Sequence, residues 1–197
     1  MNKTFLETIK IFDGEVFHID YHQKRYESVL KDFSILEIKD LKSFINPPKS
    51  GLYRCRLTYD LSSPTQDIKV QYMKYEKKDV KTLKIIYDNN IKYKHKSTCR
   101  DKIDKLYALR DNCDDIIIVK DSLLTDTSIA NIAFYTTNEW ITPKSPLLKG
   151  TTRQRLIDNG ELIESDIKVQ DIKKFTKIAL LNAMIGFDIL ESCEFLI

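Results

Sequence analysis

Four consecutive β-branched residues, Ile116 to Val119, constrain the fold of this chain more than any other stretch. A strand with apolar side chains on both faces has to be covered on both faces, so this run predicts a strand inside a sheet. The rest of the chain alternates between short strand patterns and helical patterns. Strands are expected at 5–11, 15–17, 52–59, 68–75, 83–87, 115–120, 131–136, 139–142, 161–164 and 177–181, and helical segments at 20–30, 35–44, 101–110, 150–157 and 171–175.

Turn and boundary signals organise these elements. Asp13-Gly14 is a hairpin signal between the first two strands, and Asp20 is expected to cap the helix that follows. Residues 62–65 (Ser-Ser-Pro-Thr) are expected to form the turn between the strands at 52–59 and 68–75. The charged segment 76–79 has nothing to bury, which is typical of a domain boundary. We therefore predict a small N-terminal domain, 1–79, and a larger C-terminal domain, 80–197.

Composition narrows the class of protein. Of the 197 residues, 42% are hydrophobic and 31% are charged, as in ordinary globular proteins, and a net charge of +3 does not by itself indicate nucleic-acid or membrane binding. No apolar run has the length of a membrane helix, and the N-terminus has no signal-peptide core. The four cysteines form no C-x-x-C pair, and His95 with Cys99 supplies only two potential ligands. Reduced thiols, a cytoplasmic location and no metal site are expected.

One lysine, Lys96, stands just before a helical pattern and is flanked by small or polar residues. A lysine amine can act as a nucleophile when burial and neighbouring cations lower its pKa. Because Lys92, Lys94 and Lys96 alternate, the alternative interpretation is a basic strand edge that faces water. That edge, with Tyr87 and Tyr93 for base stacking, also leaves an RNA-binding module as an alternative.

Two further segments carry candidate ligand-binding groups. Gly150, Thr151 and Thr152 open a helix, where free backbone N–H groups, hydroxyls and the positive end of the helix dipole suit a phosphate. A capped helix without a ligand is the alternative. Asp126 is expected in a turn of small polar residues, where its carboxylate could pair with a protonated heterocycle or simply form an Asx turn.

Pairs of basic residues share faces of the predicted elements. Arg54 and Arg56 are two residues apart on one strand, so both project from the same face. Two guanidinium groups on one face suit a ligand with two carboxylates, although arginine pairs are also common on ordinary surfaces. His22 and Arg25, three residues apart, share a face of the first helix.

Taken in order, these segments resemble the class IV (fold-type IV) pyridoxal-phosphate enzymes, which include branched-chain and D-amino-acid aminotransferases and aminodeoxychorismate lyase. The resemblance implies an α+β fold of two domains, a small α/β N-terminal domain and a larger, α/β-barrel-like C-terminal domain, and a homodimer. It spans nearly the whole chain, through Phe5-Leu6-Glu7-Thr8, His22 to Ser28, Tyr53-Arg54-Cys55-Arg56-Leu57, Lys96 with Arg100, Asp126 to Asn131, Leu148 to Arg153, and Leu181-Asn182-Ala183.

The resemblance implies a role for each cofactor-binding residue, with pyridoxal 5'-phosphate as the cofactor. Lys96 matches the Schiff-base lysine, which also moves protons at the substrate's alpha carbon. Arg25 matches the arginine that binds the cofactor phosphate, and Thr151 and Thr152 fall on the phosphate loop. Asp126 occupies the place of the family's glutamate beside the pyridine nitrogen, and it is one methylene shorter.

Within the family, the pattern is similar to that of 4-amino-4-deoxychorismate lyase. Thr8 matches a threonine that acts as an acid toward the departing pyruvate, and Asn182 matches an asparagine typical of the lyases. Arg54 and Arg56 could hold the carboxylates of a chorismate-derived substrate. The implied reaction yields 4-aminobenzoate and pyruvate, a step toward folate. A class IV aminotransferase with the same cofactor residues is the alternative.

The N-terminus departs from the family pattern. Family members usually carry an additional strand and a Gly-Asp-Gly segment ahead of the Phe-x-Glu-Thr motif. Only four residues precede Phe5 in this chain. The expectation from the sequence is therefore a small domain without one edge strand, either as a trimmed, active enzyme or as a protein that keeps the fold and has lost activity.

Overall fold

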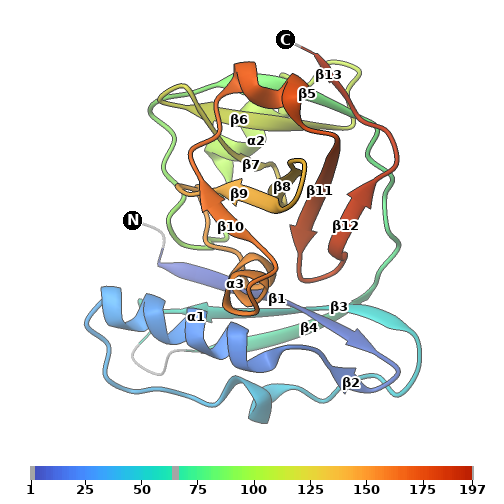
Figure 1. Cartoon of the computed structure of the whole chain (residues 1–197). Helices are drawn as coiled ribbons and strands as arrows, with labels where there is room; N and C mark the ends of the chain where they lie inside the picture. Colours follow the sequence, from blue (N-terminus) through green and yellow to red (C-terminus); the bar gives the residue numbers. More distant parts are fainter. Residues whose placement is uncertain (1–2, 64–66, 197) are drawn as a thin grey trace. The chain divides into compact units, whose positions relative to one another are not determined.

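The computed structural model describes residues 3–63 and 67–196, and Figure 1 shows the chain. The chain divides into two compact units, each with its own sheet. Unit 1 comprises Met1–Lys77 and His95–Cys99, and unit 2 comprises Lys78–Lys94 and Arg100–Ile197. The domain limits 1–79 and 80–197 stay a proposal. Pro64 and Thr65 of the predicted turn lie outside the described residues.

The sheet of unit 1 is antiparallel throughout, in the order β2-β1-β3-β4. The β1–β3 pairing runs without interruption from Thr4 opposite Asp60 to Phe12 opposite Leu52. Asp13 and Gly14 both have positive φ, 48° and 83°, as a two-residue hairpin turn requires, so the predicted hairpin is confirmed. The strands are β1 (Thr4–Phe12), β2 (Glu15–Val16), β3 (Leu52–Asp60) and β4 (Ile68–Lys74).

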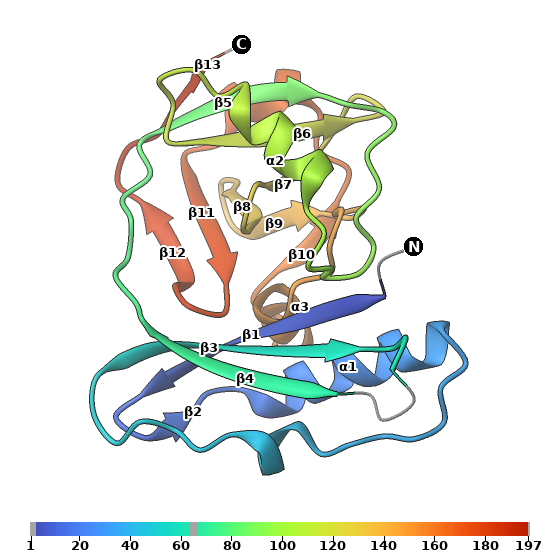
Figure 2. The same cartoon turned by 180° about the vertical axis from the view of Figure 1, so that it is seen from behind.

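Helix α1 (Ile19–Asp32) lies along one face of this sheet in both views (Figures 1 and 2). It buries Tyr26, Val29 and Leu30 in one cluster with apolar side chains of β1 and β3. The helix begins after His18, whose φ of 54° is left-handed, and no side chain caps it. The prediction that Asp20 is the cap was therefore wrong; Asp20 lies in the first turn, where its charge favours the helix dipole.

The predicted helix at 35–44 is mostly absent, and only Leu41–Phe44 forms a short 3-10 helix, η1. The Gln23 side chain on α1 explains the difference. Its amide donates to the carbonyl of Lys39 at 3.0 Å and its oxygen accepts from the amide of Leu41 at 3.0 Å. A side chain from another element thus binds backbone groups that an α-helix would have used internally.

Unit 2 contains a sheet of nine described strands in the order β10-β9-β8-β7-β6-β5-β13, with β11 paired to both β8 and β12. Pairing is parallel for β5–β6, β5–β13 and β9–β10 and antiparallel elsewhere. The strands are β5 (Thr82–Tyr87), β6 (Asp115–Lys120), β7 (Leu123–Thr127), β8 (Asn131–Tyr135), β9 (Trp140–Pro143), β10 (Ile163–Ser165), β11 (Lys177–Asn182), β12 (Gly186–Leu190) and β13 (Glu194–Leu196).

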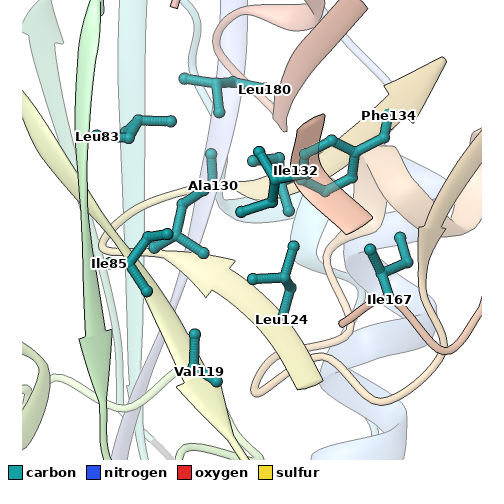
Figure 3. Close-up of a cluster of buried hydrophobic side chains, with 11 residues drawn as sticks. Leu83, Ile85, Val119, Leu124, Ala130, Ile132, Phe134, Ile167 and Leu180 are labelled. Carbon is teal, nitrogen blue, oxygen red and sulfur yellow. The ribbon is translucent and has the colours of Figure 1, made fainter. Parts of the chain in front are cut away.

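Strand β6 is covered on both faces, as its sequence predicts. Ile117 and Val119 join the main cluster of unit 2, where Figure 3 shows side chains from several strands converging on one interior. Ile116 and Ile118 pack on the opposite face with Ile103 of helix α2 (Asp101–Ala108). Helix α3 (Thr151–Asp158) covers a further cluster beside β8 and β11.

Other boundaries in unit 2 depart from the predictions. Asp126 lies within strand β7 and not in a turn. The strand expected at 161–164 forms at Ile163–Ser165, the helical turn expected at 171–175 forms at Val169–Lys174 (η2), and β12 and β13 were not predicted. Within the described residues, no helix is long and apolar enough to cross a membrane.

Candidate active site

Lys96 lies in a segment that docks on β1 within unit 1. The amide of Leu6 donates to the Lys96 carbonyl at 2.9 Å, the amide of Thr98 donates to the Thr4 carbonyl at 3.0 Å, and Ser97 forms a bridge with Phe5. Residues 92–96 do not form a strand, so the alternative interpretation of this segment as a basic strand edge was wrong. Lys96 is half-buried, whereas Lys92 and Lys94 are exposed.

A buried carboxylate, Glu7, organises the basic residues of unit 1. Glu7 is 0% exposed and accepts hydrogen bonds from the Arg25 Nε at 2.9 Å and from the Arg25 Nη2. Nδ1 of His22 lies 2.6 Å from Oε2 of Glu7, the same oxygen that accepts from the Arg25 Nη2. Burial alone would raise the pKa of Glu7, but the charge of Arg25 and the hydrogen bonds of His22 and Arg25 lower it to about 2.

His22 is buried beside two positive charges. Burial lowers its pKa; Glu7 opposes that effect, and the charges of Arg25 and Lys96 lower the pKa further. The imidazole is therefore neutral at pH 7 and donates from Nδ1 to the Glu7 carboxylate. The sequence predicted that His22 and Arg25 share a face of the helix, but it assigned no role to Glu7. The signal was present, because Glu7 interrupts the apolar face of β1 between Phe5 and Ile9.

The opposite face of the same sheet carries the residues expected to contact substrate. Thr8 pairs directly with Arg56, and Lys10 pairs with Arg54. Directly opposed residues lie on one face of an antiparallel pair, so Thr8, Arg54 and Arg56 share a face. Glu7 and α1 lie on the other face. The prediction that Arg54 and Arg56 project together is confirmed, and the register adds Lys10 and Thr8 to them.

In unit 2, Asp126 is held inside a network of neutral donors. It is 6% exposed and accepts from the Asn131 Nδ2 at 2.7 Å and from the Leu148 amide at 2.9 Å. Burial raises its pKa to about 6, although these hydrogen bonds and the charge of Arg153 act in the opposite direction. At pH 7 a carboxylate with this pKa is mostly ionised and can still exchange a proton.

The second feature of unit 2 is a candidate anion site at the N-terminus of helix α3. Gly150 is the N-cap and provides no side-chain cap. The first intrahelical bond runs from the Gln154 amide to the Gly150 carbonyl at 2.9 Å, so the amides of Thr151, Thr152 and Arg153 precede it. Both threonine side chains are buried at this end of the helix. Amides, hydroxyls and the helix dipole there fit a phosphate group.

Asn182 ends strand β11. Its side-chain oxygen accepts from the amides of Met184 at 2.9 Å and Ile185 at 3.1 Å, and so shapes the turn that leads to β12. A substrate contact through its amide nitrogen stays a prediction. Among the described residues, no group of three or more histidine, cysteine, aspartate or glutamate side chains is placed to hold a metal ion.

Known proteins place these features in a family. The pattern of the amino-transferase class IV family matches residues 4–190. The chain belongs to this family. A protein of Haemophilus influenzae is 36% identical over 186 residues, which cover 91% of this chain and 97% of that protein. A crystal structure from Haemophilus somnus, provisionally named a 4-amino-4-deoxychorismate lyase, is 34% identical with a TM-score of 0.85 and covers 94% of this chain and 98% of that one.

Similarity extends to a more distant solved structure and to a more distant sequence. A Mycobacterium tuberculosis protein described as a hypothetical aminotransferase, solved in its PLP-bound form, superposes with a TM-score of 0.79 at 16% identity and covers 98% of this chain and 81% of that chain. A Schizosaccharomyces pombe protein provisionally named an aminodeoxychorismate lyase is 24% identical over 202 residues, 93% of this chain and 87% of that protein. The predicted class IV fold is confirmed by these likenesses.

Proposed function

We propose that this class IV family member is a pyridoxal-phosphate-dependent lyase that converts 4-amino-4-deoxychorismate to 4-aminobenzoate and pyruvate. The observation that carries the proposal is the register of β1 and β3, which sets Thr8 beside Arg56 and two residues from the Lys10–Arg54 pair. A hydroxyl next to paired guanidinium groups suits a substrate that has two carboxylates and a leaving group to protonate. Two relatives with the same provisional name support the proposal.

The same proposal assigns the cofactor-binding residues. Thr151, Thr152 and the first amides of α3 bind the phosphate, and Arg25 adds positive charge whose orientation Glu7 fixes. Asp126 accepts a hydrogen bond from the protonated ring nitrogen. When bound, pyridoxal phosphate supplies a ring that withdraws electrons from the substrate's alpha carbon. Lys96 would hold the cofactor through its amine in the resting enzyme, and the substrate's amino group would replace that amine on binding and leave it free to act as a base.

Two residues of the chain move protons in the proposed reaction. The Lys96 amine removes the proton from the ring carbon that carries the substrate's amino group. The bond between the ring and the enolpyruvyl oxygen then breaks, and the ring becomes aromatic. The Thr8 hydroxyl donates a proton to the departing oxygen, while Arg54, Arg56 and Asn182 hold the substrate. This elimination of pyruvate needs no amino acceptor, whereas a transamination does.

The first test is covalent attachment at Lys96. The full-length protein is incubated with pyridoxal phosphate, and its visible absorbance is followed before and after borohydride reduction. We expect the Lys96→Ala variant to lose the band of the lysine-bound cofactor, and peptide mass spectrometry to find the reduced adduct on Lys96. Lys92→Ala and Lys94→Ala are matched controls, because both lysines are exposed and lie in the same segment. An unchanged band in Lys96→Ala would show that the assignment is wrong.

The second test separates the lyase from an aminotransferase. The holoenzyme is mixed with 4-amino-4-deoxychorismate, without any 2-oxo acid, and pyruvate is measured. Release of pyruvate and 4-aminobenzoate supports the lyase, and Thr8→Val is expected to slow it by roughly 10²-fold or more if Thr8 is the acid. Turnover that depends on an added 2-oxo acid and an amino acid would instead establish the aminotransferase.

A further inference from the structure

Two side chains, Asp126 of β7 and Asn131 of β8, bind the loop that precedes α3. These residues are cross-strand partners in the β7–β8 pair, so ordered strands fix their positions. The Asn131 Nδ2 donates to Asp126 at 2.7 Å and also to the carbonyl of Leu148 at 2.8 Å. Its Oδ1 accepts from the amide of Gly150 at 3.1 Å.

Asp126 reaches the same loop. Its second oxygen accepts from the amide of Leu148 at 2.9 Å, so both polar backbone groups of Leu148 are bound by this pair of side chains. The two hydrogens of the Asn131 amide nitrogen are both used, and a flipped amide would set its oxygen against the Asp126 carboxylate. The network therefore defines a single orientation of Asn131.

Packing at Gly150 adds an independent constraint. A Cβ at this position would lie 2.0 Å from the Asn131 Oδ1 and 3.2 Å from its Cγ. The backbone at Gly150, φ −72° and ψ 146°, is open to any residue, so glycine is required for space and not for conformation. The side chain of Asn131 thus occupies the space that a side chain at position 150 would need, directly beside the first turn of α3.

We infer that Asn131 is a positioning residue, which locks the loop Leu148–Gly150 to Asp126 and so sets the phosphate-binding end of α3 at a fixed place relative to the ring-nitrogen carboxylate. The inference rests on the proposed cofactor site. Asn131 touches neither the ring nor the phosphate in this role; it acts through Asp126 and through the loop. The hydrogen bonds of Asn131 thus connect the residue proposed to bind the ring nitrogen with the loop that leads to the proposed phosphate site.

The test compares two probes, pyridoxal 5'-phosphate and pyridoxal, which differ only in the phosphate. Dissociation constants for both are measured by absorbance titration of the full-length protein. In Asn131→Ala we expect the preference for the phosphorylated probe to fall roughly tenfold or more, because the loop and the amides behind it are no longer fixed. Asn138→Ala, an exposed asparagine in a turn of the same unit, is the control and is expected to leave the preference unchanged.

A double-mutant cycle tests the contact with Gly150. Gly150→Ala alone is expected to lower the same preference, because its Cβ and the Asn131 side chain cannot both keep their places. In the Asn131→Ala background the added Cβ has room, so Gly150→Ala should have little further effect. Equal effects of Gly150→Ala in both backgrounds would overturn the inference.

A cofactor-free measurement keeps this inference separate from the proposed function. Carboxyl NMR of the Asp126 side chain is followed against pH in the wild type and in Asn131→Ala. Loss of a donor to the carboxylate is expected to raise the pKa of Asp126 above its value of about 6. Failure of the wild type to bind either probe would overturn the cofactor proposal, whereas an unchanged pKa with an unchanged probe preference would overturn the role of Asn131.

Discussion

Glu7 in unit 1 and Asp126 in unit 2 are both buried carboxylates, yet their chemistry is opposite. Glu7 is bound by the Arg25 guanidinium and by His22, and its pKa falls to about 2. Asp126 is bound by the neutral donors Asn131 and Leu148, and its pKa rises to about 6. Burial acts in the same direction on both. The partners decide the outcome, because the guanidinium bound directly to Glu7 offsets its loss of hydration, whereas the neutral donors and the charge of Arg153 do not fully offset that of Asp126.

This difference suits different tasks. Glu7 stays ionised at every physiological pH and holds Arg25 in one orientation, so it serves as a fixed structural charge. Asp126 titrates close to neutrality, which suits a group that shares a proton with a ring nitrogen. The following predictions test whether the identity of the partner, and not the degree of burial, separates the two carboxylates.

The largest effect is expected from Arg25→Met, which leaves Glu7 buried without its cation. Breaking a buried pair in this way typically destabilises by about 3–5 kcal/mol. Urea denaturation of the cofactor-free protein at pH 7 measures the change. Glu7→Gln combined with Arg25→Met should cost less than the sum of the single changes, and strict additivity would contradict the pairing.

Opposite pH dependences are expected from the two carboxylates. The pKa of Glu7 is lowered from 4.5 to about 2, so its contribution is present above pH 4.5 and is lost as the pH falls toward 2. The pKa of Asp126 is raised from 3.8 to about 6, so its contribution is present below pH 3.8 and is lost as the pH rises through 6. Each pKa shift corresponds to a change of about 3 kcal/mol in the free energy of unfolding across its pH range.

The measurement is the free energy of unfolding as a function of pH in the wild type, Glu7→Gln and Asp126→Asn. The difference between wild type and Glu7→Gln should shrink as the pH falls below 4.5. The difference between wild type and Asp126→Asn should change between pH 3.8 and 6, with the wild type losing stability as the pH rises. If the difference in unfolding free energy from wild type changed with pH in the same direction for both variants, the comparison would be refuted.

A smaller loss is expected from His22→Leu. The substitution removes a neutral donor to Glu7 while Arg25 remains in place, and the loss of one hydrogen bond to a charged group typically costs about 1.5–3 kcal/mol. Urea denaturation at pH 7 measures it. His22→Gln, which can still donate to Glu7, should recover part of the loss, whereas equal destabilisation by both variants would point to packing alone.

The smallest effect is expected where a cation pairs with a carboxylate in water. Lys174 donates to Asp171 at 2.7 Å on the surface, and this hydrogen bond lowers the pKa of Asp171. Solvent screens such pairs, so Lys174→Met should leave the urea midpoint within experimental error. If Lys174→Met lowered the free energy of unfolding as much as Arg25→Met, an exposed ion pair would stabilise the protein as strongly as a buried one.

Local patterns determined much of this fold. The four β-branched residues of β6 required a strand covered on both faces, the Asp13-Gly14 turn required a hairpin, and Gly150-Thr151-Thr152 required a helix start, all as the structure has them. Each depends on backbone preferences or on side-chain periodicity within a few residues. The order of the motifs, read along the chain, also indicated the class IV family.

Contacts between distant residues decided the rest, because a hydrogen bond formed far along the chain leaves no periodic signal. The Gln23 side chain on α1 hydrogen-bonds to the backbone of Lys39 and Leu41, which takes the place of the helix predicted at 35–44. The backbone of Lys96 hydrogen-bonds to β1, some ninety residues earlier in the chain. This contact leaves Lys96 half-buried, whereas Lys92 and Lys94, which follow the same alternating pattern, are exposed. The sequence identified Asp126 as a candidate ligand and contained Glu7 within a family motif without a role, but the partners of both carboxylates, and hence their pKa values, were determined by tertiary structure.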